Sequence, residues 1–204
     1  MNSVTAAFSF VVLFFALIAP CDSQFNRKRQ GDRVKVDVYI EAQCPFSTKF
    51  MHNQLIPFVR KYPNHPNLID LRVIPHGNTV CHKGIRRIHC TCFHGFAECQ
   101  LNQLMNCVIK HHPYIYDHLE TLSCIQGQPD LASAQFSCIR GRPDEASLMR
   151  CTKSYKGRKL LLESGYTTNR AGVNIVPWVT LNGWFNDPAS IHFEREVCNI
   201  SPNC

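Results

Sequence analysis

A short apolar stretch that ends on a cysteine turn, residues 34–47 (VKVDVYIEAQCPFS), constrains the fold more than any other part of the chain. Its apolar residues recur at every second position and are mostly β-branched or aromatic, which predicts a β-strand. Pro45 suits the first turn of a helix, and the apolar residues after it recur at helical spacing. Cys44 is therefore expected at a helix N-terminus, where the macrodipole and the free N–H groups favour a reactive thiolate. This layout is typical of a thiol–disulfide exchange site, except that Ser47 stands at the fourth position of the motif.

The start of the chain predicts a leader rather than part of the fold. Residues 6–20 form an almost uninterrupted apolar run, too short to span a bilayer and followed by small and polar residues. We therefore expect a signal peptide at residues 1–23, a basic tail at residues 24–33 and one domain at residues 34–204. The tail is interpreted as solvated, with cleavage by a basic-specific protease as the alternative. No other run is long and apolar enough for a membrane span, so the mature chain is expected in the secretory pathway, extracellular or lysosomal.

The number of cysteines supports the same compartment. The chain has twelve cysteines, which in an oxidising compartment indicates disulfides. Removing Cys21 with the signal peptide and setting Cys44 aside leaves ten, enough for five structural disulfides without a remainder. Asn199 begins a glycosylation sequon, which Pro202 weakens. The ten candidates for disulfides are Cys81, Cys90, Cys92, Cys99, Cys107, Cys124, Cys138, Cys151, Cys198 and Cys204.

The order of the predicted elements indicates an α/β protein. A helix with Pro57 as its kink or end follows the first strand, and residues 68–74 form a second strand. The segment from about residue 81 to 166 holds most of the cysteines and is predicted as a helical, disulfide-rich insertion. A strand then resumes near Val176, and Asn182-Gly183 predicts a hairpin turn before a last helix at residues 188–197. The helical candidates in the insertion start near Ala97 and continue with residues 114–124, 131–138 and 144–155, with Asp144 as an N-cap. The order matches a thioredoxin-like sheet with the helical insertion between its second and third strands.

Val176 and Pro177 precede the third strand, and an X-Pro bond can be cis at modest cost. A cis-proline that faces the reactive cysteine is the second element of a thioredoxin-like site, because it exposes the backbone of the preceding residue to a substrate strand. The alternative is an ordinary trans proline at the start of a strand. The position of Pro177 relative to Cys44 and to the predicted hairpin favours the cis form.

A second motif lies in residues 92–107, CFHGFAECQLNQLMNC. Its spacing, C-x-H-G-x-x-E-C-x-x-N-x-x-x-x-C, resembles the signature of the gamma-interferon-inducible lysosomal thiol reductase family. Three further pieces are similar to that family: the strand before Cys44, the turn at residues 74–78 and the segment at residues 176–183. The resemblance spans roughly residues 34–198. The seven fixed positions of the signature, all met here, are Cys92, His94, Gly95, Glu98, Cys99, Asn102 and Cys107.

The resemblance implies a thioredoxin-like fold and the reduction of disulfides of endocytosed proteins at acidic pH. It also implies that Cys44 is the nucleophile and that the second, resolving cysteine is replaced by Ser47. Serine cannot break a mixed disulfide. Three outcomes stay open: release by an external small thiol or by the substrate's own second thiol, resolution by another cysteine of the chain, or a catalytically silent, secreted thioredoxin-like binding protein.

The cysteines of the signature are interpreted as disulfide partners rather than as chemistry. The alternative is a zinc site, but the spacing does not give the paired ligand geometry of a structural zinc. We therefore expect no metal and no cofactor, with an external small thiol as reductant. The expected partners are disulfide-containing proteins, and because basic and aromatic residues do not interleave, nucleic acid is not expected. The cysteines and histidines that supply zinc-ligand types are Cys81, His82, His89, Cys90, Cys92, His94 and Cys99.

Overall fold

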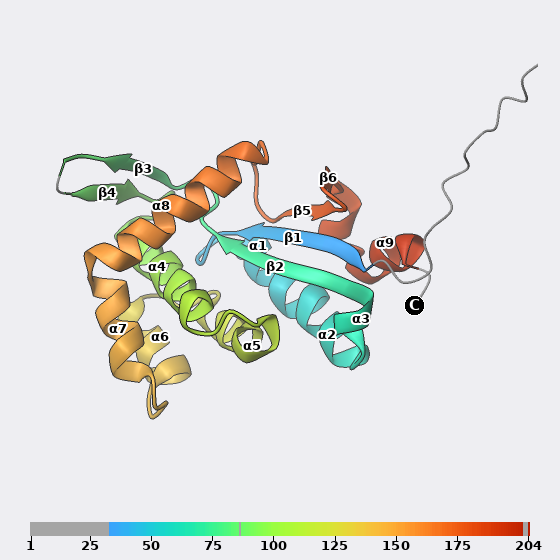
Figure 1. Cartoon of the computed structure of the whole chain (residues 1–204), viewed down its shortest axis with the longest axis horizontal. Coiled ribbons are helices and arrows are strands. Elements are labelled where there is room, and N and C mark those ends of the chain that lie inside the picture. Colours follow the sequence, from blue (N-terminus) through green and yellow to red (C-terminus); the bar gives the residue numbers. More distant parts are fainter. Residues whose placement is uncertain (1–32, 86, 202–203) are drawn as a thin grey trace, which may run out of the picture.

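The computed structural model describes residues 33–85, 87–201 and 204, so the predicted signal peptide and most of the basic tail lie outside the described residues. A four-stranded sheet has the order β2-β1-β5-β6 (Figure 1). β1 pairs in parallel with β2 and antiparallel with β5, so it lies in the middle of the sheet. The strands are β1 (Val34–Ile40), β2 (Ile69–Pro75), β5 (Trp178–Leu181) and β6 (Trp184–Phe185).

The helix that follows the Cys44 turn continues across Pro57. It consists of α1 (Pro45–Phe50), a π-helical turn η1 (Met51–Leu55) and α2 (Ile56–Lys61). Pro57 lies at the start of α2, directly after the π-helical turn η1, so the helix does not end at this proline. The rings of Phe50 and Phe58 pack edge to face against Phe193, with centroids 5.7 and 5.1 Å apart. This packing joins the first helix to the last one through the core.

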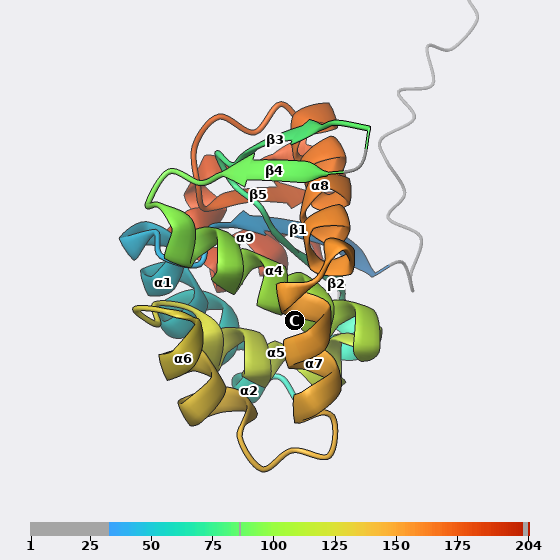
Figure 2. The same ribbon diagram turned by 90° about the vertical axis from the view of Figure 1, so that its left-hand side faces the viewer.

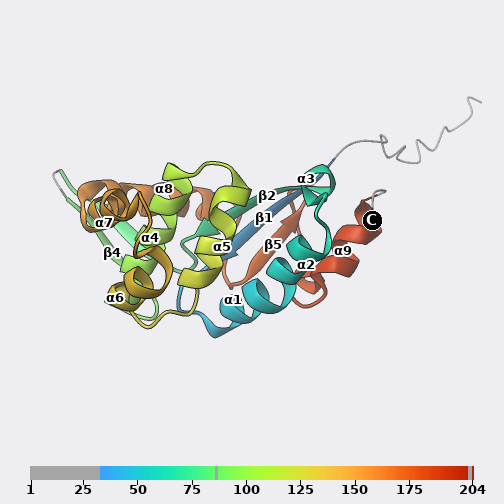
Figure 3. The same cartoon turned by 90° about the horizontal axis from the view of Figure 1, so that it is seen from below.

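The predicted insertion between the second and third strands of the sheet is mainly helical. Figure 3 shows its helices at one end of the molecule, with the four-stranded sheet, α2 and α9 at the other. The sequence did not predict α8, which carries two glycines. A Cβ on Gly165 would lie 2.5 Å from Nε2 of the buried His76, and one on Gly157 would lie 2.7 Å from the Cys151 carbonyl oxygen. The glycines therefore serve close packing, although they lower helix propensity. The helices are α4 (Phe96–His111), α5 (Ile115–Ile125), α6 (Leu131–Ala134), η2 (Gln135–Ile139), α7 (Glu145–Lys153) and α8 (Tyr155–Arg170).

The prediction that the insertion is helical from about residue 81 was wrong for its first part. β3 (Val80–Lys83) and β4 (Ile88–Thr91) form an antiparallel hairpin in which Cys81 faces Cys90. Figure 2 shows this hairpin beside α8. The strands are largely exposed and carry His, Lys and Thr side chains, so they lack the apolar alternation that indicates a strand.

The last part of the chain completes the sheet and covers it. Asn182 and Gly183 have φ angles of 53° and 85°, as expected of the predicted hairpin turn between β5 and β6. The predicted last helix is divided into a 3-10 turn η3 (Asp187–Ser190) and α9 (Phe193–Ile200). A short helix, α3 (His65–Leu68), occupies part of the loop predicted before β2. Within the described ranges, no helix has the length and apolar character needed to cross a membrane.

Candidate active site

Cys44 occupies the N-cap position of α1, immediately before Pro45. The residue is buried, with 6% of its surface exposed. It is the only cysteine of the described residues that is not in a disulfide. Its thiol donates to the carbonyl oxygen of Val176, with the sulfur 3.7 Å from that oxygen. The structure thus brings together two segments that are far apart in the sequence.

The position of Val176 follows from the sheet. β5 begins at Trp178, which pairs with Tyr39 near the end of β1. The residues just before β5 therefore lie next to the loop that leads from β1 to Cys44. The Val176–Pro177 peptide bond is cis, which is the form that the sequence favoured over a trans proline.

Ser47, at the position of the missing second cysteine, is fully buried. Its hydroxyl oxygen accepts a hydrogen bond from the backbone N–H of Glu41 at 3.4 Å. The side chain therefore supports the loop before Cys44. A hydroxyl offers no thiol for a second exchange step.

The ten other cysteines of the described chain form five disulfides. Cys92–Cys99 and Cys107–Cys151 hold the two halves of α4, and Cys81–Cys90 crosses the β3–β4 hairpin. Because these cysteines are oxidised, they offer no thiolates to the zinc site considered as an alternative. The remaining pairs are Cys124–Cys138 and Cys198–Cys204.

Two polar residues of the second motif reach the loop before Cys44. Glu98 and Asn102 are one turn apart on α4 and are fully buried. Oε2 of Glu98 accepts from the backbone N–H of Gln43 at 3.3 Å. Oδ1 of Asn102 accepts from the backbone N–H of Ala42 at 3.0 Å. The sequence singled out both residues by resemblance but did not predict these contacts.

His94 and Gly95 complete the N-terminal end of α4. His94 donates its backbone N–H to Oε1 of Glu98 at 3.1 Å, and its ring nitrogen Nδ1 lies 2.6 Å from Oε2. Gly95 has a φ of 97° at the N-cap, a conformation that favours glycine. Together they orient the Glu98 carboxylate toward the loop.

The sequence missed two further residues of this site, Glu41 and Gln126. The side-chain amide of Gln126 donates to the carbonyl oxygens of Glu41 and Ala42, at 2.7 and 3.1 Å. The sequence gives no clear indication of Gln126, since a single glutamine after a helix has no distinctive pattern. Glu41 directly follows an apolar strand, and a charged residue there is a recognisable signal for a buried polar site.

Glu41 is buried, with 1% of its surface exposed. Burial raises the pKa of its carboxyl group, and the charge of Glu98 adds to this effect. The backbone N–H of Asn78, which donates to the carboxylate, and the nearby His94 oppose it. Ligand atoms of Glu41, His94 and Glu98 lie within 4.8 Å of one another. Both carboxylates already accept backbone N–H groups, so these hydrogen bonds account for their placement.

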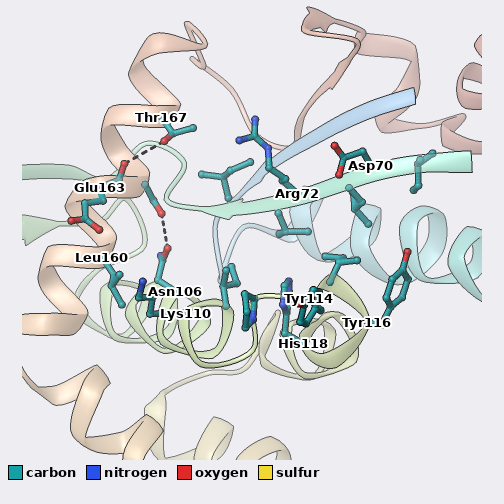
Figure 4. A pocket seen from close by; sticks show the side chains of 18 of the residues that line it. Asp70, Arg72, Asn106, Lys110, Tyr114, Tyr116, His118, Leu160, Glu163 and Thr167 are labelled. Carbon is teal, nitrogen blue, oxygen red and sulfur yellow. Dashed lines mark hydrogen bonds between the residues drawn. The ribbon is translucent and has the colours of Figure 1, made fainter. Parts of the chain in front are cut away.

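One groove lies away from Cys44. It has a volume of about 740 Å³ and follows β2 between α4, α5 and α8. Figure 4 shows Asp70 and Arg72 on the strand, with their side chains directed away from Lys110 and Tyr116 of the helices. Its lining contains no cysteine.

Known proteins resemble this chain in sequence. Residues 35–142 match the family model described as gamma interferon inducible lysosomal thiol reductase (GILT). GILT-like protein C02D5.2 of Caenorhabditis elegans is 37% identical over 81% of this chain, which spans only about half (52%) of that relative. GILT-like protein 2 of Drosophila melanogaster is 26% identical, with 93% of this chain and 90% of the relative covered. The gamma-interferon-inducible lysosomal thiol reductase of Carassius auratus is also 26% identical, with coverages of 85% and 69%.

Solved structures resemble it in fold. BdbD from Bacillus subtilis in its oxidised form has a TM-score of 0.59 at 11% identity, with 82% of this chain and 86% of that chain covered. DsbA from Chlamydia trachomatis has a TM-score of 0.56 at 16% identity, with coverages of 82% and 84%. These similarities confirm the predicted α/β, thioredoxin-like fold with a helical, disulfide-rich insertion.

Proposed function

Because the chain belongs to the gamma-interferon-inducible lysosomal thiol reductase family, we propose that it is a thiol–disulfide oxidoreductase with Cys44 as its single nucleophile. The observation that carries the proposal is the environment of this cysteine. It is the free cysteine of the described chain, it stands at the start of a helix, and its sulfur lies against the Val176 carbonyl beside Pro177. The proposed substrates are proteins that contain disulfides, in the extracellular space or the lysosome.

The reaction begins when the Cys44 thiolate attacks one sulfur of a substrate disulfide. The substrate S–S bond breaks, a mixed disulfide with Cys44 forms, and the displaced substrate sulfur leaves as a thiolate that takes up a proton. The Val176 carbonyl lies next to the Cys44 sulfur, so we propose that the backbone before Pro177 contacts the substrate at this step.

Release needs a second thiol, which Ser47 does not supply. An external small thiol attacks the mixed disulfide and a second molecule of that thiol completes the exchange. The net reaction then converts one substrate disulfide and two small thiols into two substrate thiols and one small-molecule disulfide. If the substrate's own second thiol attacks instead, the disulfide is rearranged and no net reduction takes place.

The test compares the wild-type protein with Cys44→Ala in the reduction of insulin by excess glutathione, at pH 4.5 and at pH 7. We expect the wild type to accelerate reduction and the variant to match the uncatalysed rate. Equal rates for the two proteins would remove the enzymatic proposal. As a control for the starting state, mass analysis after alkylation without reduction is expected to find one modified cysteine, Cys44.

One observation favours a second function. Because Ser47 is buried and hydrogen-bonded within the loop, the site is compatible with a binding protein whose Cys44 attacks a partner's disulfide, releases one partner thiol and keeps the resulting mixed disulfide without turnover. A stable mixed disulfide at Cys44 that excess glutathione fails to release would favour this function over the enzyme.

A further inference from the structure

The three residues that precede Cys44 form a loop whose backbone is held by side chains of other segments. The N–H groups of Glu41, Ala42 and Gln43 donate to Ser47, Asn102 and Glu98 respectively. The carbonyl oxygens of the loop accept further hydrogen bonds. The side-chain amide of Gln126 donates to those of Glu41 and Ala42, and the backbone N–H of Gly127 donates to that of Ala42 at 2.8 Å. A loop without regular structure is thereby fixed as fully as a strand.

The acceptors on α4 are strong because they are buried. Glu98 and Asn102 have no exposed surface, and neither has Ala42. A buried N–H that loses its partner costs more than an exposed one, because water cannot replace the bond. The side-chain nitrogen of Asn102 has no hydrogen-bond partner among the described residues. The bond to Ala42 therefore accounts for an asparagine at this position better than any contact of its nitrogen does.

The helix that carries these acceptors is itself fixed by covalent bonds. Cys92–Cys99 closes the turn in front of α4, and Cys107–Cys151 ties its second half to α7. Both disulfides are buried. Figure 1 shows α4 beside the ends of β1 and β2, and the loop that leads to α1 starts from this end of β1. The loop is thus attached to a rigid element rather than to a mobile one.

We propose that Glu98 and Asn102 are positioning residues for the exchange chemistry of Cys44. They hold the backbone of Gln43 and Ala42 so that the Cys44 sulfur stays at the start of α1 and against the Val176 carbonyl. This inference rests on the proposed function, since it concerns the same cysteine. Neither side chain is required to touch the substrate.

The inference gives each fixed position of the second motif a physical role. The three cysteines fix α4, Gly95 allows the chain to enter the helix at a positive φ, and His94 orients the Glu98 carboxylate. The spacing of four between Glu98 and Asn102 follows from the helix, because residues four apart lie on one face. A motif far from Cys44 in sequence therefore acts on the residue that carries the chemistry.

The main test uses Asn102→Leu, an uncharged substitution that keeps the branching and the number of side-chain heavy atoms and leaves the Ala42 N–H unpaired. The matched control is Leu104→Ala, which removes buried surface from the same helix but no bond to the loop. The rate of Cys44 alkylation by iodoacetamide is measured against pH, at a temperature where all variants are fully folded. We expect the midpoint of the curve to move to higher pH by about half a pH unit in Asn102→Leu, because a displaced sulfur loses helix N-terminal stabilisation. Leu104→Ala is expected to keep the wild-type midpoint.

A second pair of variants covers the case in which Asn102→Leu does not fold. Glu98→Leu removes both acceptors, whereas Glu98→Gln keeps an acceptor oxygen for the Gln43 N–H. We expect the rate of mixed-disulfide formation with a disulfide-bonded peptide to fall on the order of tenfold in Glu98→Leu and to recover most of this loss in Glu98→Gln. Wild-type alkylation midpoints in Asn102→Leu, or equal exchange rates for Glu98→Leu and the wild type, would overturn the inference. Alkylation needs no turnover, so this outcome is distinguishable from a failure of the Cys44→Ala assay.

Discussion

Four of the five disulfides lie in the segment between β2 and β5, whereas within the described chain no disulfide joins a strand of the four-stranded sheet to another element. The sheet is held by apolar burial instead. Val36, Val38 and Ile40 of β1 have no exposed surface, and the rings of Phe50, Phe58 and Phe193 pack beneath them in one core. One chain therefore uses two different means of stabilisation in two neighbouring regions.

The difference matters because Cys44 stands where the regions meet. Its sulfur contacts the sheet side through Val176, and its loop is bonded to the insertion through Glu98 and Asn102. The proposed reaction uses an external thiol, and the rest of the protein would be exposed to that thiol as well. A core held by apolar burial does not respond to it, and the disulfides of α4 are buried from it. Substitutions in the sheet region and in the insertion can test whether the two regions are stabilised in these different ways.

The largest expected effect concerns the turn itself. Ser47→Cys places a thiol one helical turn after Cys44, and residues three apart in a helix are neighbours. Attack on a mixed disulfide then becomes intramolecular, so the lifetime of the Cys44 mixed disulfide with a peptide is expected to fall by several orders of magnitude in a quench experiment. Ser47→Ala is the control, because it removes the hydroxyl without adding a thiol, so its mixed disulfide should still need an external thiol for release. A lifetime of Ser47→Cys equal to that of Ser47→Ala would mean that the turn does not bring the two positions together.

The next effect tests the sheet side. Phe193→Ala removes a fully buried ring from the core and is expected to lower the free energy of unfolding by about 3–5 kcal/mol. The loss is measured by urea unfolding, with and without a small thiol. It should be the same in both conditions if this region depends on burial alone. Ile191→Ala, at a position that is 64% exposed, is expected to cost little. If the loss of unfolding free energy in Phe193→Ala differed with and without the thiol, the sheet region would not depend on apolar burial alone.

The sequence predicted the sheet side well and the insertion less well, for a physical reason. The strands around Val38 and Val179 are buried and apolar, so their residue pattern alone predicts a strand. The hairpin at Cys81 and Cys90 is exposed and is held by a bond between facing residues. Its pattern therefore contains too little apolar alternation to indicate a strand.

The same reasoning applies to the candidate site. Cys44, Ser47 and Pro177 could be named from the sequence because a turn and an X-Pro dipeptide are local signals. The contacts of Glu98 and Asn102 could not be derived, because they join residues 55 and 60 positions apart through the packing of α4. The resemblance identified these residues, and only the structure gives them a partner. Gln126 lacked both kinds of signal.

A third prediction compares two disulfides. Replacing both Cys107 and Cys151 by Ala opens a loop with a sequence separation of 44, and the chain-entropy model gives a loss of about 4 kcal/mol. The same change at Cys198 and Cys204, with a separation of 6, gives about 2 kcal/mol. Both losses are measured by urea unfolding under oxidising conditions. Equal losses would show that the insertion does not depend on its covalent links more than the end of the chain does.

The smallest effect concerns pH and the buried Glu41. Burial raises the pKa of this carboxyl group, so the folded chain binds the proton more tightly than the unfolded chain. The resulting contribution to stability is fully present below the ordinary glutamate pKa and is lost as the pH rises through the folded value. Glutamine does not titrate. The difference between the Tm of Glu41→Gln and the Tm of the wild type is therefore expected to increase in favour of the variant as the pH rises from 4 to 7.

Glu194 provides a control of opposite sign. Hydrogen bonds from Lys61 and Tyr62 lower the pKa of its carboxyl group, so its contribution is present above the ordinary pKa and is lost as the pH falls. The Tm of Glu194→Gln should therefore fall relative to the wild-type Tm as the pH rises from 4 to 7. The change should be small because the ion pair of Glu194 with Lys61 is partly exposed. Parallel trends for the two variants would contradict the assignment of Glu41 to a buried site. Opposite trends would show that protonation of the buried Glu41 carboxyl group stabilises the fold, whereas protonation of Glu194 destabilises it.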